Sequence, residues 1–245
     1  MNLPSPLISG RLVRRYKRFL ADVELDDGRK VTAHCANPGA MTGLKDPGLK
    51  VWMSTHDNPK RKLKYSWELA ELEGHNGSRP ALVGINTSLP NAIVREALEA
   101  EQIPELRGYD HLRAEVPYGQ NSRIDFLLES PGRPPCYVEV KNVHLMRRPG
   151  LAEFPDSVTR RGAKHLDELR TEVLKGNRAV MLYVIQRTDT DSFALAHDID
   201  PTYARNFAAA LEAGVEAFAY NCQISLSDVS LDRRCLITDM NSPAS

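Results

Sequence analysis

Short runs of alternating apolar and polar residues occupy the first 80 positions, and none of them has the 3.6-residue periodicity of a long helix. With Gly, Pro and Asn between the runs, this pattern predicts about five short strands. Such strands are typical of a small barrel, and oligonucleotide-binding (OB) barrels are one class of these. The predicted strands cover residues 12–25, 30–35, 51–55 and 65–72, with turns at Asp26-Asp27-Gly28 and His75-Asn76-Gly77.

Helices and strands alternate after residue 89. Pro90 begins a predicted helix with an apolar stripe that ends before Pro104. Two strand-like segments follow, and a second helix is expected from about Asp156 to Lys175. The apolar run 178–186 predicts a strand buried on both faces. A third helix is expected with Asp200 as its N-cap and Gly214 at its end, followed by a strand over residues 215–220.

This succession predicts two domains. Residues 1–84 would form the OB-like β-barrel, and residues 85–245 an α/β domain with a mixed central sheet. The order of strands and helices in the second part is the one that a restriction-endonuclease-like core uses.

Charge is uneven along a chain whose net charge is zero. Residues 1–90 hold 14 Lys and Arg against 9 Asp and Glu, an excess of five positive charges, and the remainder has 18 against 23. Basic clusters suit a phosphate backbone, although a solvated surface is the more common explanation of a single cluster. Two clusters in one acid-poor segment make nucleic-acid contact about as well supported as a solvated surface. The candidate nucleic-acid-binding side chains in the first part are Arg14, Arg15, Lys17, Arg18, Lys60, Arg61, Lys62 and Lys64.

The four cysteines show neither Cys-x-x-Cys spacing nor metal-ligand spacing to histidine, so the sequence favours a reducing compartment without disulfides or structural zinc. No apolar run has the length of a membrane span or a targeting segment. We expect a cytoplasmic protein without membrane contact.

The candidate chemistry lies in the two strand-like segments at residues 123–128 and 137–141. Each carries charge among apolar neighbours, where charge is costly unless it is used. A hairpin of the two segments would bring Asp125, Glu139 and Lys141 to one surface. Two carboxylates that bind Mg²⁺ or Mn²⁺, with a lysine beside them, suit metal-assisted hydrolysis of a phosphodiester. A surface ion pair between Glu139 and Lys141 is the plainer alternative.

Two further residues are candidates for this site. Glu96, on the predicted helix after Pro90, would supply another metal-binding carboxylate, or would be an ordinary solvated residue. Gln186, at the end of the buried strand, would orient a water or a phosphate, or would cap the strand end.

A hydroxyl-rich and basic stretch precedes and opens the second helix. A helix N-terminus attracts phosphate, so side chains there would follow a nucleic-acid backbone. His165 lies off the apolar stripe and is expected at the surface. The candidates are Arg160, Arg161, Lys164 and His165.

The chain closely resembles the sugar fermentation stimulation protein A family over nearly its whole length. The resemblance implies an OB-like barrel joined to a domain of the PD-(D/E)XK nuclease superfamily, DNA binding with little sequence preference, and the superfamily motif at Asp125, Glu139 and Lys141. Ile124 replaces the proline of the motif name, and Pro38 and Ala40 stand where many relatives have Thr and Ser. The stretches that carry the resemblance are HCANPGAM at 34–41, NTSLPN at 86–91 with Glu96, SRIDFLL at 122–128, YVEVKNV at 137–143 and FPDSVTRRGAKHL at 154–166.

Two functions remain open at this stage. The first is a magnesium- or manganese-dependent nuclease acting on nucleic acid, expected to be DNA. The sequence does not fix its oligomeric state and leaves open the homodimer that is common among enzymes that cut both strands. The second is a non-catalytic, sequence-nonspecific DNA-binding regulator linked to sugar (maltose) metabolism. An acidic partner other than nucleic acid is a third possibility, which the salt dependence of binding would separate from backbone contact.

Overall fold

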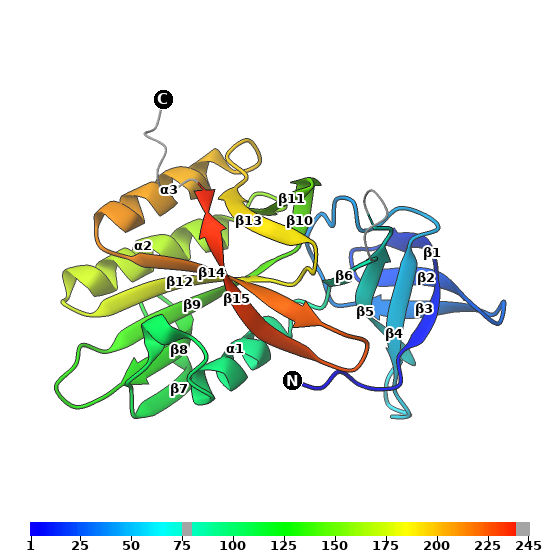
Figure 1. Cartoon of the computed structure of the whole chain (residues 1–245), viewed down its shortest axis with the longest axis horizontal. Coiled ribbons are helices and arrows are strands. Elements are labelled where there is room, and N and C mark those ends of the chain that lie inside the picture. The colour runs from blue at the N-terminus through cyan, green and yellow to red at the C-terminus, as the bar shows by residue number, and fades with distance from the viewer. Residues whose placement is uncertain (75–79, 239–245) are drawn as a thin grey trace.

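The computed structural model describes residues 1–74 and 80–238 and shows a small β-barrel beside a larger α/β domain (Figure 1). The turn predicted at His75-Asn76-Gly77 lies outside the described residues. Within the described ranges, no helix is long and apolar enough to cross a bilayer.

The barrel is one sheet that closes on itself, antiparallel except at the closing pair of strands. Its strand order is β3-β2-β1-β4-β5-β6, and parallel pairing of β3 with β5, Ala33 opposite Tyr65, closes the ring. Trp67, Met53 and Leu12 fill its interior. The predicted OB-like barrel is therefore confirmed. Its strands are β1 (Ile8–Tyr16), β2 (Leu20–Leu25), β3 (Lys30–Cys35), β4 (Lys50–Thr55), β5 (Tyr65–Leu72) and β6 (Ala81–Gly84).

The expectation of one strand over residues 12–25 was wrong, because the chain reverses at Lys17, Arg18 and Phe19. Tyr16 and Leu20 face each other across this three-residue turn. Lys17 and Arg18 both adopt left-handed backbone angles, with φ of 46° and 65°. Side chains with a Cβ are strained at these angles. The sequence has neither Gly nor Asn at these two positions, the residues that normally mark such a turn, and the turn was therefore not predicted.

The α/β domain is built on a nine-stranded mixed sheet of order β10-β11-β13-β15-β14-β12-β9-β8-β7. The mixed-sheet α/β architecture is thus confirmed, and β9, β12 and β14 run parallel in its centre. The strands are β7 (His111–Tyr118), β8 (Ser122–Glu129), β9 (Cys136–Val143), β10 (Leu145–Arg148), β11 (Gly150–Phe154), β12 (Arg178–Ile185), β13 (Thr190–Leu195), β14 (Glu216–Ile224) and β15 (Val229–Ile237).

Helices cover both faces of this sheet. α2 (Arg160–Leu174) and α3 (Pro201–Glu212) pack on one face, and α1 (Pro90–Glu99) packs on the other, followed by a 3₁₀ turn at Pro104–Leu106 (Figure 1). The three predicted helices are confirmed, including the N-cap at Asp200, whose side chain accepts a hydrogen bond from Tyr203 N at 2.9 Å.

Strands β7, β10, β11, β13 and β15 were not predicted. α2 begins four residues later than expected, after its N-cap Thr159. Leu174, its last residue, is 75% exposed.

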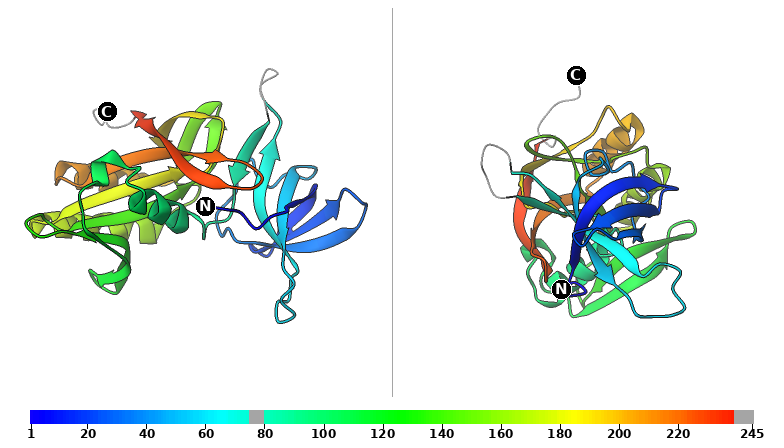
Figure 2. Two further views of the ribbon diagram at one scale, coloured as in Figure 1. Left: turned by 60° about the horizontal axis from the view of Figure 1, so that its bottom comes forward. Right: turned by 90° about the vertical axis from the view of Figure 1, so that its right-hand side faces the viewer.

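The first seven residues lie against the α/β domain before the chain enters the barrel (Figure 2, left). Leu3 is buried in the core beneath α1, and Leu3 N donates to Ser227 O at 2.8 Å. Val229 N donates to Met1 O at 2.9 Å. The chain therefore passes between the domains twice, before β1 and again between Gly84 and Pro90.

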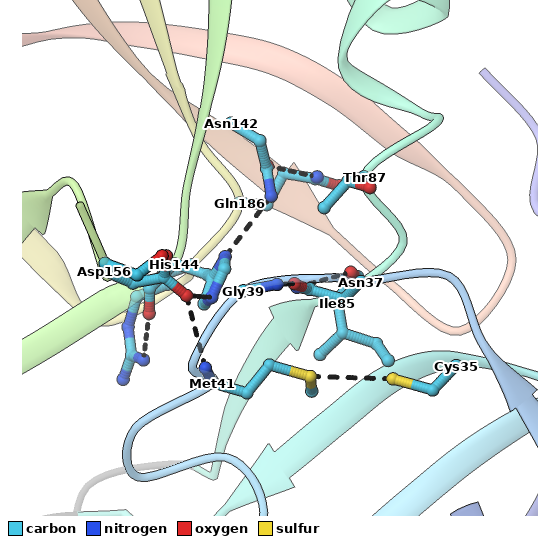
Figure 3. A network of polar contacts seen from close by, with 12 residues as sticks. Cys35, Asn37, Gly39, Met41, Ile85, Thr87, Asn142, His144, Asp156 and Gln186 are labelled. Atoms are coloured by element: carbon cyan, nitrogen blue, oxygen red, sulfur yellow. Dashed lines mark hydrogen bonds and ion pairs between the residues drawn. The ribbon is translucent and has the colours of Figure 1, made fainter. Parts of the chain in front are cut away.

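A network of polar contacts joins the loop after β3 to the α/β domain (Figure 3). Asp156 Oδ2 accepts a hydrogen bond from Met41 N at 3.2 Å and lies 3.3 Å from His144 Nε2. Asn37 Nδ2 donates to Ile85 O at 3.0 Å. Gly39 packs so closely on Asp156 that a Cβ at this position would collide with the carboxylate. These contacts fix the barrel against the strands that carry the candidate site.

Candidate functional site

The candidate site lies where β8 and β9 separate. Their paired residues run from Leu128 opposite Cys136 to Phe126 opposite Val138, and pairing stops there. Beyond this point the Asp125 side chain takes the place of the ladder, and its Oδ2 accepts a hydrogen bond from Val140 N at 2.7 Å. Its Oδ1 accepts from Asn91 Nδ2 on α1, also at 2.7 Å. The carboxylate is therefore held from two elements.

Glu139 and Lys141 extend from β9 toward α2. Glu139 is only 2% exposed, and its Oε1 lies 2.6 Å from Lys141 Nζ. Its Oε2 is buried and has no hydrogen-bond partner among the described residues. β9 lies between β8 and β12 and is not an edge strand. The plain surface ion pair considered for Glu139 and Lys141 is thus excluded, because the pair is buried.

The two carboxylates influence each other electrostatically. Burial, and then the nearby charge of Glu139, raises the pKa of Asp125 above its ordinary value. Burial alone would raise the pKa of Glu139 as well, but Lys141 and His165 outweigh it and lower that pKa. The lysine thus stabilises one carboxylate, while the other is destabilised by a like charge. A bound cation would relieve this repulsion.

The donor set suits a hard divalent cation. Mg²⁺ commonly binds through one or two carboxylates and completes its octahedron with waters and substrate phosphate oxygens. Among residues 1–74 and 80–238, no group of three or more Asp, Glu, His or Cys is arranged to enclose a metal ion. Asp125 and Glu139, whose Oε2 has no partner among the described residues, therefore fit a Mg²⁺ or Mn²⁺ site of the kind held by two carboxylates.

The surface position expected for His165 was wrong. His165 is 3% exposed, and its Nδ1 contacts Glu139 Oε1 and lies 3.3 Å from Lys141 Nζ. Arg161 Nε donates to His165 Nε2 at 3.2 Å, so the proton of a neutral ring lies on Nδ1 and faces Glu139. The inward face of α2 is wider than its apolar stripe and also buries Glu168, which explains the error.

Glu96 and Gln186 lie outside this cluster. Glu96 is exposed on α1, pairs with the amino group of Met1 at 2.8 Å and lines a cavity that Asp125 also lines. Gln186 is buried at the domain junction, where its Nε2 donates to Asn142 Oδ1 at 2.6 Å and its backbone O accepts from Gly84 N (Figure 3). Its contacts thus join β12 to the barrel strand β6.

The basic candidates of the barrel lie at the end of β1 and in two loops. Arg14 pairs with Asp22 at 2.8 Å, and Arg15 donates to three backbone oxygens, those of Arg18, Asn37 and Gly39. Arg15 therefore ties the turn after β1 to the loop at the domain junction. The remaining candidates are exposed, at the turn after β1 and in the loop between β4 and β5: Lys17, Arg18, Lys60, Arg61, Lys62 and Lys64.

Arg160, Arg161 and Lys164 lie on the first turns of α2 and are exposed. Arg161 and Lys164 line a cavity together with His165. These basic groups adjoin Glu139, whereas the basic loops of the barrel belong to the other domain.

Three residues of the site were not singled out from the sequence. Asn91 orients Asp125, and Arg123 lines the cavity beside His165. The Tyr118 hydroxyl is buried without a hydrogen-bond partner among the described residues. Burial, and then the charges of Glu139 and Glu168, raises the pKa of Tyr118. Asn91 falls in the NTSLPN stretch and Arg123 in the SRIDFLL stretch, both of which carry the family resemblance. No sequence signal indicates Tyr118.

The fold and the site together define a class of protein with an OB barrel followed by a mixed-sheet α/β domain that carries a buried glutamate beside a half-buried aspartate and lysine. Two family models match the chain in this order: the SfsA N-terminal OB domain over residues 13–79 and the sugar fermentation stimulation protein RE domain over residues 88–228. The chain belongs to the sugar fermentation stimulation protein family.

Curated relatives carry the same description over almost their entire length. A sugar fermentation stimulation protein homolog of Maricaulis maris is 59% identical over 233 residues, covering 95% of this chain and 97% of that protein. The homolog of Methylorubrum populi is 55% identical over 245 residues, covering 100% and 97%. A solved structure of SfsA from Pyrococcus furiosus in complex with Ca²⁺ is similar with a TM-score of 0.84 and 27% identity, covering 97% of each chain.

Proposed function

We propose that this protein is a divalent-metal-dependent nuclease that hydrolyses phosphodiesters in nucleic acid, with DNA as the expected substrate. The observation that carries the proposal is the convergence of Asp125, Glu139 and Lys141 where β8 and β9 separate. Burying two carboxylates side by side costs free energy, and a regulator that only binds DNA gains nothing from carboxylates directed at phosphate.

Each of the three side chains has a role in this chemistry. Asp125 and Glu139 would hold Mg²⁺ or Mn²⁺, which when bound neutralises charge on the phosphate. Lys141 would position the attacking water or stabilise the negative charge that develops on the phosphate oxygens. His165 holds Glu139 in place through Nδ1 and acts as a positioning residue.

The Ca²⁺ complex of the Pyrococcus furiosus relative supports a cation in this protein. Ca²⁺ and Mg²⁺ are both hard cations that take oxygen ligands, so a carboxylate pair that binds one can also bind the other. The exposed basic loops of the barrel would hold the nucleic-acid backbone without reading its sequence. We expect the protein to act in the cytoplasm, and a homodimer would allow both strands of a duplex to be cut.

The test is cleavage of DNA and RNA with Mg²⁺ or Mn²⁺ by the wild type, Glu139→Ala and Lys141→Ala. Glu212→Ala, an exposed change at the end of α3, is the matched control. We expect cleavage by the wild type and the control only. Equal cleavage by all four proteins would show that the residues are wrongly assigned. If all four bind DNA and none cleaves any substrate, the alternative of a non-catalytic DNA-binding regulator is favoured.

A further inference from the structure

A cavity of about 310 Å³ opens directly beside the candidate site. Residues of β7, β8 and α2 line it, among them Glu115, Ser122, Arg123, Arg161, Lys164 and His165. His165 also contacts Glu139, so the cavity and the carboxylate pair share a wall. A ligand in this cavity would lie next to the bond that the site would cleave.

Three cations face this space. Arg123 Nη1 donates to Glu115 O at 2.7 Å, and Lys164 Nζ donates to Gln120 O at 2.5 Å. Arg161 uses its Nε on His165, and its two terminal nitrogens have no hydrogen-bond partner in the described part of the chain. Only Lys164 also approaches a carboxylate, that of Glu168, at 3.4 Å. Glu115 is the one carboxylate residue among the described residues of the lining, so the three cations outnumber it.

Backbone strain holds one of these cations in position. Glu115 lies within β7 opposite Asp125, yet its φ is +54°, a left-handed conformation that interrupts the ladder between Ala114 and Val116. Its carbonyl accepts the hydrogen bond from Arg123. Non-glycine residues adopt such angles rarely, and they cluster at ligand-binding and catalytic sites.

The surface on the other side of Asp125 has the opposite charge. A cavity of about 500 Å³ there is lined by Glu96, Glu99, Glu115 and Asp125. Two cations also line it: Arg95 lies 3.8 Å from Glu99, and the amino group of Met1 lies 2.8 Å from Glu96. Glu115 and Asp125 are left without an ion pair in the described part of the chain. A polynucleotide that continued from the basic cavity past Asp125 would meet like charges. The strand is therefore expected to approach the site from one side and to end there.

We propose that the basic cavity binds a terminal phosphate monoester of a nucleic-acid strand, which makes the protein an end-directed enzyme. A terminal phosphate carries nearly two negative charges and three acceptor oxygens, more than an internal diester, and so matches Arg123, Arg161 and Lys164 better. The proposal rests on the proposed function, because it names the form of nucleic acid that the same site receives.

The test is equilibrium binding by the full chain in EDTA, where no metal-dependent cleavage occurs. The probes are oligonucleotides of one sequence with a 5′-phosphate, a 3′-phosphate or hydroxyls at both ends. We expect about tenfold tighter binding of one phosphorylated form. Inorganic phosphate should compete away that advantage. The double variant Arg123→Gln/Arg161→Gln should bind all three probes with equal affinity.

Arg170→Gln, an exposed change on the same helix outside the cavity, is the matched control and should keep the preference. Equal wild-type binding of all three probes, or a preference that survives the double variant, would overturn the proposal. The outcome is separate from that for the proposed function. Cleavage without a preference for phosphorylated ends would contradict only the proposed phosphate site. A preference for phosphorylated ends without cleavage would contradict only the proposed nuclease activity.

Discussion

The carboxylate of Asp125 and the backbone N–H of Val140, 2.7 Å apart, replace the ladder hydrogen bond that β8 and β9 no longer make. Asp125 thus has a structural role as well as the proposed chemical one. We expect Asp125→Ala to lower the free energy of unfolding by about 1–3 kcal/mol, because it leaves the donors of Val140 and Asn91 without an acceptor.

Asp125→Asn separates the two roles, because it keeps one acceptor oxygen. It should lose less stability than Asp125→Ala in urea unfolding, while both variants should lose metal-dependent cleavage. Equal stability losses for the two variants would show that neither hydrogen bond contributes.

Lys141 should control the pH range in which Glu139 can bind a metal. The pKa of Glu139 lies below its ordinary value of 4.5 because Lys141 and His165 outweigh the effect of burial. Its charge therefore contributes stability above about pH 4.5, and this contribution is lost as the pH falls through the lowered pKa. In Lys141→Gln the pKa should rise. The pH at which half of the Mn²⁺ affinity is lost should then shift upward, and Lys164→Gln should leave it in place.

Acid should weaken the domain junction through Asp156. Burial opposes ionisation of this side chain, but His144 and the backbone N–H of Met41 outweigh it and lower the pKa from 3.8 to about 2. The stabilisation is present above pH 3.8 and is lost as the pH falls toward 2. We expect Asp156→Asn to cost about 2 kcal/mol at pH 7 and to flatten the pH dependence of unfolding in that window.

Asp198 is the comparison for this experiment. Its pKa is also about 2, through its hydrogen bond with Arg147, but it is exposed. Solvent screens such a pair, so Asp198→Asn should change stability little. If the two variants behave alike, the contacts of Asp156 with the barrel do not contribute to stability.

The strained turn after β1 should lower the free energy of unfolding while it contributes positive charge to nucleic-acid binding. Lys17→Asn/Arg18→Gly places a common hairpin pair at two left-handed positions and should raise the free energy of unfolding by about 1–2 kcal/mol. The same change removes two exposed positive charges beside Phe19, which is 44% exposed and stacks on His34. Affinity for nucleic acid should therefore fall, with a shallower salt dependence. Unchanged affinity would mean that this turn does not contact the backbone.

The pair of charged strands could be predicted because Asp125, Glu139 and Lys141 stand among residues that must be buried. The starts of α1 and α3 could also be predicted, since Pro90 and Asp200 are local signals of a helix N-terminus. His165 was misplaced because its partner Glu139 is 26 residues away, and no local pattern reports such a contact.

The unpredicted strands were missed for a related reason. β15 carries charged side chains at Asp232, Arg233 and Arg234, which hide its alternation, and one of its two pairing partners, β13, lies far back in the chain. The turn at Lys17 and Arg18 was missed because neither residue is one of the types that usually occupy left-handed turn positions.

The path of residues 1–7 along the α/β domain limits how the two domains can move. The covalent connection after β6, and the segment before β1 that packs and hydrogen-bonds on the α/β domain, act as a pair of tethers. A body held at two points can swing about the line between them but cannot rotate freely. The barrel would therefore stay on the same side of the carboxylate pair throughout any opening motion. Nucleic acid held by the barrel would accordingly reach the site from a fixed direction.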